Sequence, residues 1–258
     1  MIREQLLQHD IGRDVKFRWR GHEISRIEGL SDGVFAFAIT LLVVSLEVPK
    51  TFGELYQTMR GFGAFAICFA LLFIVWFNQY KFFRRYALQD VMTIVLNGAL
   101  LFVVLFYVYP LKFLFTALVD RMMGGRNEVH LANGNVEPMM ESSQMGTVML
   151  IFGAGYFAVF AVFVLLYLHA YRKRDELGLN ELERFDTRTS VQEGVLNCLV
   201  ALVSTSLVVF GGFRYAPLAG LTYMLTGVVL AIHGVIMGKR RGRLEQSVSS
   251  AEVEGVQS

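Results

Sequence analysis

Long apolar blocks separated by short polar stretches dominate the pattern along the chain. Each of six blocks is long enough to cross a hydrocarbon core of about 30 Å, which takes roughly 20 helical residues. The blocks predict transmembrane helices at residues 28–48, 61–82, 91–118, 146–171, 191–213 and 216–237. Segments of about ten residues with alternating polar and apolar side chains, typical of membrane β-barrels, are absent from the sequence. We therefore expect an all-α, polytopic membrane protein.

The overall composition agrees with this pattern and indicates one membrane domain. Of 258 residues, 54% are hydrophobic and 18% are charged, an apolar excess over ordinary soluble domains. We expect a cytoplasmic N-terminal segment at 1–25, a six-helix transmembrane domain at 26–240 and a disordered cytoplasmic tail at 241–258. The segment 119–145 contains glycine turn signals and predicts an irregular extracytoplasmic loop. Residues 1–25 lack the apolar core of a cleavable signal peptide, so the first span itself should direct insertion.

The placement of lysine and arginine predicts the orientation in the membrane. Eighteen of the 24 basic residues fall in the N-terminal segment, the second and fourth connections and the C-terminal tail. The remaining six lie on the other side of the predicted spans. Because cytoplasmic loops are enriched in basic residues, both termini should be cytoplasmic.

The motifs of common enzymes and metal sites are absent from the sequence. It contains no GxxxxGK[ST] phosphate loop, no GxSxG nucleophile turn and no HExxH helix. Cys68 and Cys198 fall within predicted spans, and the five histidines show no ligand spacing. We therefore expect no enzymatic activity, no resident metal, no cofactor and no nucleic-acid partner.

Two capping-box patterns mark candidate helix starts. In Ser25-x-x-Glu28 and Ser190-x-x-Glu193, the serine and glutamate side chains can each accept a hydrogen bond from an unpaired amide of the first turn. The two patterns predict the starts of the first and fifth spans.

The first span carries the most informative polar residues. Asp32 lies inside the start of a long apolar helix, where an ionisable side chain costs about 2.5–3.5 kcal/mol and marks a candidate functional site. On a helix of 3.6 residues per turn, Phe37, Thr40, Val44 and Glu47 share one face. A hydroxyl between apolar layers, with an acid at the outer end, suits the wall of a narrow cation pathway. Spacing alone leaves open a helix–helix interface in which Thr40 bonds to its own backbone.

The charged residues at the start of this span need partners on other helices. Arg26 and Asp32 point about 120° apart, so they do not pair with each other. The polar residues available on the second and third spans are Trp76, Asn78, Gln79 and Asn97. We expect a structural network that ties Arg26, Ser31 and Asp32 to Trp76, Asn78 or Asn97, because polar groups in lipid must be satisfied. The alternatives are an interfacial position for Trp76 and an ordinary interhelical hydrogen bond for Asn97.

The same region resembles the signature of the transmembrane protein 175 family of potassium channels. Arg26-x-x-x-Leu30-Ser31-Asp32, running into an Ala- and Ile-containing helix with Thr40, is similar to the family's Arg-x-x-x-Phe-Ser-Asp motif. Residues 75–80 look like the end of the family's second span. The sequence from Asn97 to Tyr109-Pro110 looks like its third span. The clear match covers about the first 120 residues, and beyond it only the number of spans agrees.

The resemblance implies a six-helix unit that assembles as a homotetramer around a pore lined by the first helix of each unit. The narrow layers of the family are an aliphatic residue, a threonine and a leucine, at the positions of Phe37, Thr40 and Val44 here. Leu30 in place of phenylalanine implies a change of packing. Phe37 stands where the family usually has an aliphatic residue, and Gln79 stands where its members often have histidine. Both differences bear on conductance and selectivity.

We interpret the chain as a homotetrameric, potassium-permeable cation channel of the cytoplasmic membrane, in contact with membrane lipids and without a cofactor. The sequence has no Thr-Val-Gly-Tyr-Gly filter loop, so a ring of filter carbonyls cannot provide selectivity. One alternative is a proton-coupled secondary transporter with Asp32 as proton carrier, which predicts an inverted repeat and broken helices. The other is a non-conducting membrane scaffold in which Phe37 and Thr40 are packing residues.

Overall fold

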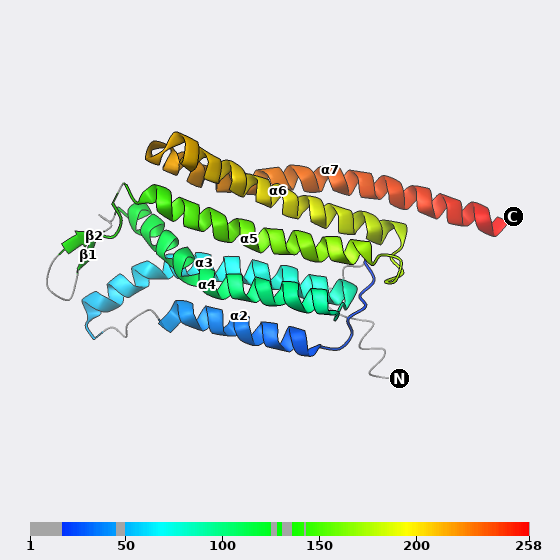
Figure 1. Ribbon diagram of the computed structural model, residues 1–258, viewed down its shortest axis with the longest axis horizontal. Coiled ribbons are helices and arrows are strands. Elements are labelled where there is room, and N and C mark those ends of the chain that lie inside the picture. Colours follow the sequence, from blue (N-terminus) through cyan, green and yellow to red (C-terminus); the bar gives the residue numbers. More distant parts are fainter. Residues whose placement is uncertain (1–16, 45–49, 125–127, 131–135, 142, 258) are drawn as a thin grey trace.

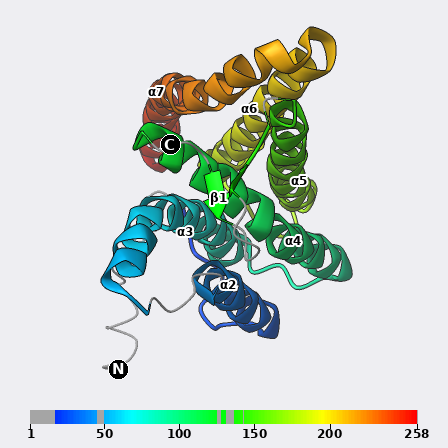
Figure 2. The same ribbon diagram turned by 90° about the vertical axis from the view of Figure 1, so that its left-hand side faces the viewer.

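A bundle of six long α-helices makes up the computed structural model, which describes residues 17–44, 50–124, 128–130, 136–141 and 143–257. The helices are α2 (Arg26–Val44), α3 (Phe52–Tyr86), α4 (Val91–Met122), α5 (Met145–Arg172), α6 (Glu181–Gly211) and α7 (Ala216–Gln257). They lie side by side along the long axis, with α2 at one edge and α7 at the other (Figure 1). Viewed along that axis, α2, α3 and α4 group on one side and α5, α6 and α7 on the other (Figure 2). The all-α fold predicted from the apolar blocks is thus confirmed.

Five of these helices contain segments long and apolar enough to cross a membrane. Among the described residues these segments are Gly61–Tyr86, Val91–Met122, Met145–Arg172, Glu181–Gly211 and Ala216–Val248. The sixth helix, α2, is 19 residues long and has three charged residues in its first two turns. Its remaining residues are apolar or small apart from Thr40, and it packs against α3 and α4.

Two segments differ from the sequence-based expectation. The tail predicted to be disordered from 241 continues as helix α7 to Gln257, and Arg241 pairs with Asp186 of α6 through Nε and Oδ1 at 2.8 Å. This ion pair fixes the start of the polar extension. The connection predicted to be irregular at 119–145 contains an antiparallel hairpin of β1 (Glu128–His130) and β2 (Val136–Pro138).

The helix starts bear out one capping prediction and correct the other. At α2, the Ser25 amide and hydroxyl both donate to Glu28 Oε1, at 3.0 and 2.9 Å, and the Glu28 amide donates to Ser25 Oγ. Ser190 instead lies inside α6, where its hydroxyl donates to the backbone oxygen of Asp186. The capping box of α6 is formed by Asn180 and Glu183. The helix begins earlier than its apolar part because asparagine is an equally good N-cap.

A short segment before α2 ties several helices together at one end of the bundle. This end also holds the α3–α4 and α5–α6 turns and the end of α7 (Figure 1). Arg20 donates to the buried carboxylate of Glu183 at 2.7 Å and to the Leu177 carbonyl at 3.0 Å. Phe17 is buried against Tyr86 of α3, with ring centroids 5.6 Å apart. The base of α2 is therefore connected to both halves of the bundle. The described parts of the basic segments predicted to be cytoplasmic lie at this end, and its assignment to the cytoplasm stays a prediction.

Candidate functional site

Helix α2 has one fully buried face and one face that the chain leaves uncovered. Ser31, Phe35, Ala38 and Leu42 face α3 and α4 and are between 0% and 2% exposed. Burial thus follows the four- and three-residue spacing of one helix face. The opposite face includes Gly33, Phe37 and Thr40, all exposed, and Phe37 is 56% exposed. The face selected from sequence spacing is therefore the one that no other part of the described chain covers.

Of the predicted lining residues, one is described only in part and one is not described. Val44 is the last residue of α2, and its side chain is outside the description. Glu47 lies outside the described residues. The geometry of the face therefore rests on Phe37 and Thr40.

The hydroxyl of Thr40 has one fixed bond and a free side. Its Oγ1 donates to the backbone oxygen of Ala36 at 2.8 Å. A hydroxyl has one donor and two acceptor lone pairs, so donation to the helix leaves the oxygen lone pairs available. The bond to Ala36 fixes the direction of this oxygen on the exposed face, and an oxygen so placed can contact a cation.

Three buried side chains connect α2 to α3 and α4. Asn97 of α4 donates to Ser31 Oγ at 2.9 Å, and Gln79 of α3 donates to Asn97 Oδ1 at 2.5 Å. Ser31 in turn donates to the Ile27 carbonyl at 2.7 Å. All three side chains are at most 2% exposed. This buried chain (Ser31, Asn97 and Gln79) joins three helices through hydrogen bonds that have no competitor in an apolar medium.

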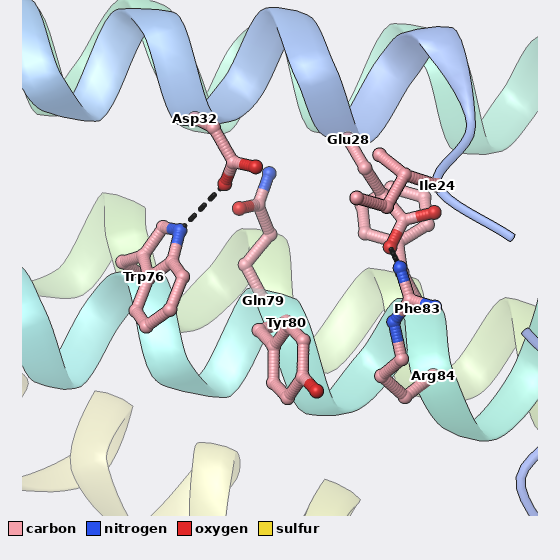
Figure 3. A pocket seen from close by; sticks show the side chains of 8 residues that line it. All are labelled: Ile24, Glu28, Asp32, Trp76, Gln79, Tyr80, Phe83 and Arg84. Carbon is pink, nitrogen blue, oxygen red and sulfur yellow. Dashed lines mark hydrogen bonds and ion pairs between the residues drawn. The ribbon is translucent and has the colours of Figure 1, made fainter. Parts of the chain in front are cut away.

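Asp32 makes a separate contact with α3. The Trp76 ring nitrogen donates to Asp32 Oδ1 at 2.7 Å (Figure 3). Asp32 and Glu28 lie one turn apart on α2 and both point toward α3, where a small pocket opens between the two helices (Figure 3). The pocket is lined by Ile24, Glu28, Asp32, Trp76, Gln79, Tyr80, Phe83 and Arg84.

Part of the predicted network is replaced by residues that the sequence analysis did not assign to it. Within the described part of the chain, the side chains of Arg26 and Asn78 make no hydrogen bond or ion pair. The ion pair at the base of α2 is instead formed by Arg84 of α3 and Glu28. Arg84 also donates to the Gly21 carbonyl at 2.7 Å. Glu28 and Arg84 both lie at ends of predicted spans that are flanked by arginine and lysine. This shared position is the sequence signal that could have suggested their pairing.

A further polar contact fixes the turn between α3 and α4. Asp90, which precedes the first residue of α4, lies 2.6 Å from His169 Nε2 and 3.6 Å from Lys173 Nζ. Partial burial of Asp90 disfavours its charge, but hydrogen bonds from Thr93 and His169 and the charge of Lys173 outweigh burial and lower the pKa of Asp90. The carboxylate therefore stays ionised and joins this turn to α5.

Metal-binding clusters do not occur in the described ranges. No group of three or more His, Cys, Asp or Glu side chains there is arranged to hold a metal ion. The side chains that define this site are therefore the Thr40 hydroxyl, the exposed Phe37 ring and the polar contacts on the buried side of α2.

Most of this chain is similar to proteins that are named potassium channels. A family model described as the endosomal/lysosomal potassium channel TMEM175 matches residues 26–107. A protein of Marivirga tractuosa named a potassium channel is 40% identical over 239 residues, which cover 92% of this chain and 96% of that protein. A potassium channel of Chamaesiphon minutus is 37% identical over 105 residues, covering 38% of this chain and 52% of its own length.

A solved structure is similar over nearly the same extent. It is the crystal structure of a variant of the potassium channel MtTMEM175 in complex with a nanobody fusion protein. The two chains are 41% identical and superpose with a TM-score of 0.76, covering 89% of this chain and 100% of the other. The likeness therefore extends well beyond the segment matched by the family model, to the helices that follow α4.

The contact between Trp76 and Asp32 generates a stability prediction. We expect Asp32→Ala to lower the melting temperature, because the indole N–H of Trp76 loses a hydrogen bond that contributes about 0.5–1.5 kcal/mol. Thermal unfolding of the purified protein measures this effect. Glu23→Ala, which removes an exposed carboxylate at the same end, is the matched control. A normally stable Asp32→Ala protein with altered ion preference would instead place Asp32 in an ion pathway.

Proposed function

The chain belongs to the TMEM175 family of potassium channels, and on this basis we propose that it is a potassium-permeable cation channel of the cytoplasmic membrane. In this proposal four copies assemble around an axis, and α2 of each copy lines the pathway. Phe37, Thr40 and Val44 form successive layers of the constriction, and Glu47 lies toward the extracytoplasmic mouth. Potassium is the permeant ion, and no cofactor takes part.

The observation that carries the proposal is the uncovered face of α2. Phe37 is 56% exposed, whereas the opposite side of the same helix is buried to within 2%. Helix α2 also lies at the edge of the bundle, where its described residues pack mainly against α3 and α4 (Figure 1). A helix at the edge of one chain cannot enclose a pathway, so copies related by a closed rotation must supply the other walls.

Selection in such a pathway has to depend on side chains. The apolar side chains of Phe37 and Val44 force a passing cation to lose part of its hydration shell. The Thr40 oxygen between them replaces part of the lost water. A hydroxyl held by Ala36 at 2.8 Å keeps its direction without reorganisation when an ion arrives. The result is a weakly coordinating site, which favours modest selectivity over tight binding.

The two alternatives are less well supported by the geometry. A secondary transporter uses interrupted helices near the membrane midplane, whereas α2 runs without a break from Arg26 to Val44. Asp32 lies in the second turn of that helix and already accepts a hydrogen bond from Trp76. A scaffold would use the exposed face of α2 only for packing, and ion flux separates this alternative from a channel.

Potassium efflux from liposomes tests the proposal. We expect purified protein in liposomes to release potassium down its gradient, with sodium flux slower under a matched gradient. Protein-free liposomes and heat-denatured protein are the controls. Absence of potassium flux from correctly assembled, folded protein would refute the channel and favour the scaffold.

The exposed ring of Phe37 should be the main barrier to ions. We expect Phe37→Ala to raise potassium flux and reduce discrimination among monovalent cations, because a smaller side chain relieves dewetting of the constriction. The matched control is Phe35→Ala on the buried face, where 2% exposure predicts a cavity and a loss of about 3–5 kcal/mol of stability without increased flux. If both variants lose stability and neither gains flux, Phe37 is a packing residue.

The hydroxyl of Thr40 should set the preference among cations. We expect Thr40→Val to weaken selectivity for potassium over sodium, since the isosteric change removes the coordinating oxygen. Thr40→Ser retains the oxygen and should keep most of the preference. Bilayer recordings of reversal potentials measure the ratio, and an unchanged ratio in Thr40→Val would remove Thr40 from the pathway.

A further inference from the structure

Helix α7 becomes basic directly after its long apolar part. Between Ala216 and Gly238 it contains no Asp, Glu, Lys or Arg, a stretch of about 34 Å at 1.5 Å per helical residue. This length matches the roughly 30 Å of a hydrocarbon core. The residues that follow are mostly basic: Lys239, Arg240, Arg241 and Arg243. They therefore lie at the level of the lipid headgroups.

One of these four residues faces the bundle and sets the direction of the others. Arg241 is 9% exposed, and its Nε lies 2.8 Å from Asp186 Oδ1 of α6. Because successive helical residues are 100° apart, Lys239 and Arg243 each point about 160° away from Arg241. The ion pair with α6 thus turns Lys239 and Arg243 away from the bundle.

The outward basic side chains have no protein partner in the described part of the chain. Lys239, Arg240 and Arg243 are all exposed, and there their side chains make no hydrogen bond or ion pair. The next acidic residue, Glu245, is bonded to Arg241 on the side toward the bundle. Three positive charges are therefore presented together at the membrane surface.

An exposed apolar stripe leads directly to these charges. Ile232 and Ile236 are 56% and 44% exposed. By the helical period, both lie with Lys239 and Arg243 inside a sector of about 60°. Helix α7 also lies at the edge of the bundle, and its end extends past the turn between α5 and α6 (Figure 1). One face of α7 thus offers an apolar surface below and a cationic surface above, the order of groups in a phospholipid.

We propose that this face of α7 binds an anionic phospholipid, with an acyl chain along Ile232 and Ile236 and the phosphate headgroup against Lys239, Arg240 and Arg243. Charge complementarity selects this ligand, because basic residues beside a spanning helix attract lipids with net negative charge. Arginine also pairs with phosphate through two parallel hydrogen bonds. The inference goes beyond the proposed function and does not depend on ion conduction.

A fluorophore on this face measures the lipid preference. It is attached to Ile236→Cys in protein whose Cys68 and Cys198 have been replaced by alanine. The protein is placed in phosphatidylcholine bilayers that contain nitroxide-labelled phosphatidylglycerol or nitroxide-labelled phosphatidylcholine. At equal fractions of labelled lipid, we expect phosphatidylglycerol to quench the fluorophore more strongly. The preference should fall in 1 M salt, where the screening length is about 3 Å instead of about 10 Å at 0.1 M.

Removing the three outward charges should remove the preference. Each basic residue near the surface contributes about fivefold to the attraction of an anionic lipid. We expect Lys239→Gln, Arg240→Gln and Arg243→Gln together to lower the relative binding constant of phosphatidylglycerol at least about tenfold. Arg240→Lys with Arg243→Lys keeps the charge and should keep most of the preference.

The matched control removes three exposed basic side chains elsewhere, with the changes Lys50→Gln, Arg121→Gln and Arg214→Gln. It should leave the preference at α7 unchanged. Equal quenching by the two lipids in the unaltered protein, or an equal loss in the control, would refute a specific site. If neither lipid quenches the fluorophore, a protein surface such as a second copy covers this face, and the proposal is wrong.

Discussion

The buried chain of Ser31, Asn97 and Gln79 determines how α2 sits in the bundle. If α2 separated from α3 and α4, the side-chain amide of Asn97 would lose its acceptor on Ser31, and a polar group left unsatisfied in lipid costs several kcal/mol. With Ser31 turned inward, the helical period also turns Ala38 and Leu42 inward. Phe37 is thereby left on the outer face. A network away from the pathway thus fixes which residues can face it.

The remaining described contacts support α2 from one side. Glu28 is bonded by Ser25 within the helix cap and by Arg84 of α3, while Lys112 of α4 donates to the Leu42 carbonyl further along the helix. A functional face needs such support, because side chains can be placed accurately only when the backbone behind them cannot shift. A single chain supplies all of this support but cannot enclose an ion pathway by itself. Assembly of several copies is therefore central to the proposed function.

The sequence predicted those features that depend on local periodicity. Apolar blocks located the helices, and the 3.6-residue period found the face of α2 that carries Phe37 and Thr40. The earlier start of α6 was missed because residues 181–190 are polar and helical, so hydropathy gave no signal there. The ion pairs of Arg84 with Glu28 and of Arg241 with Asp186 join distant segments, and no local pattern encodes such pairings. The hydrogen bond from Lys112 to the Leu42 carbonyl was not predicted, because a backbone oxygen carries no sequence signature.

The central claim is that the exposed face of α2 lines the ion pathway, and accessibility to silver ions during conduction tests it most directly. The experiment introduces Thr40→Cys, or Ala38→Cys on the buried face, into protein whose Cys68 and Cys198 have been replaced by alanine. The account predicts that silver, a cation similar in size to those conducted, blocks potassium current through the Thr40→Cys protein and leaves the Ala38→Cys protein unaffected. Equal sensitivity of the two proteins, or block of Ala38→Cys alone, would contradict it.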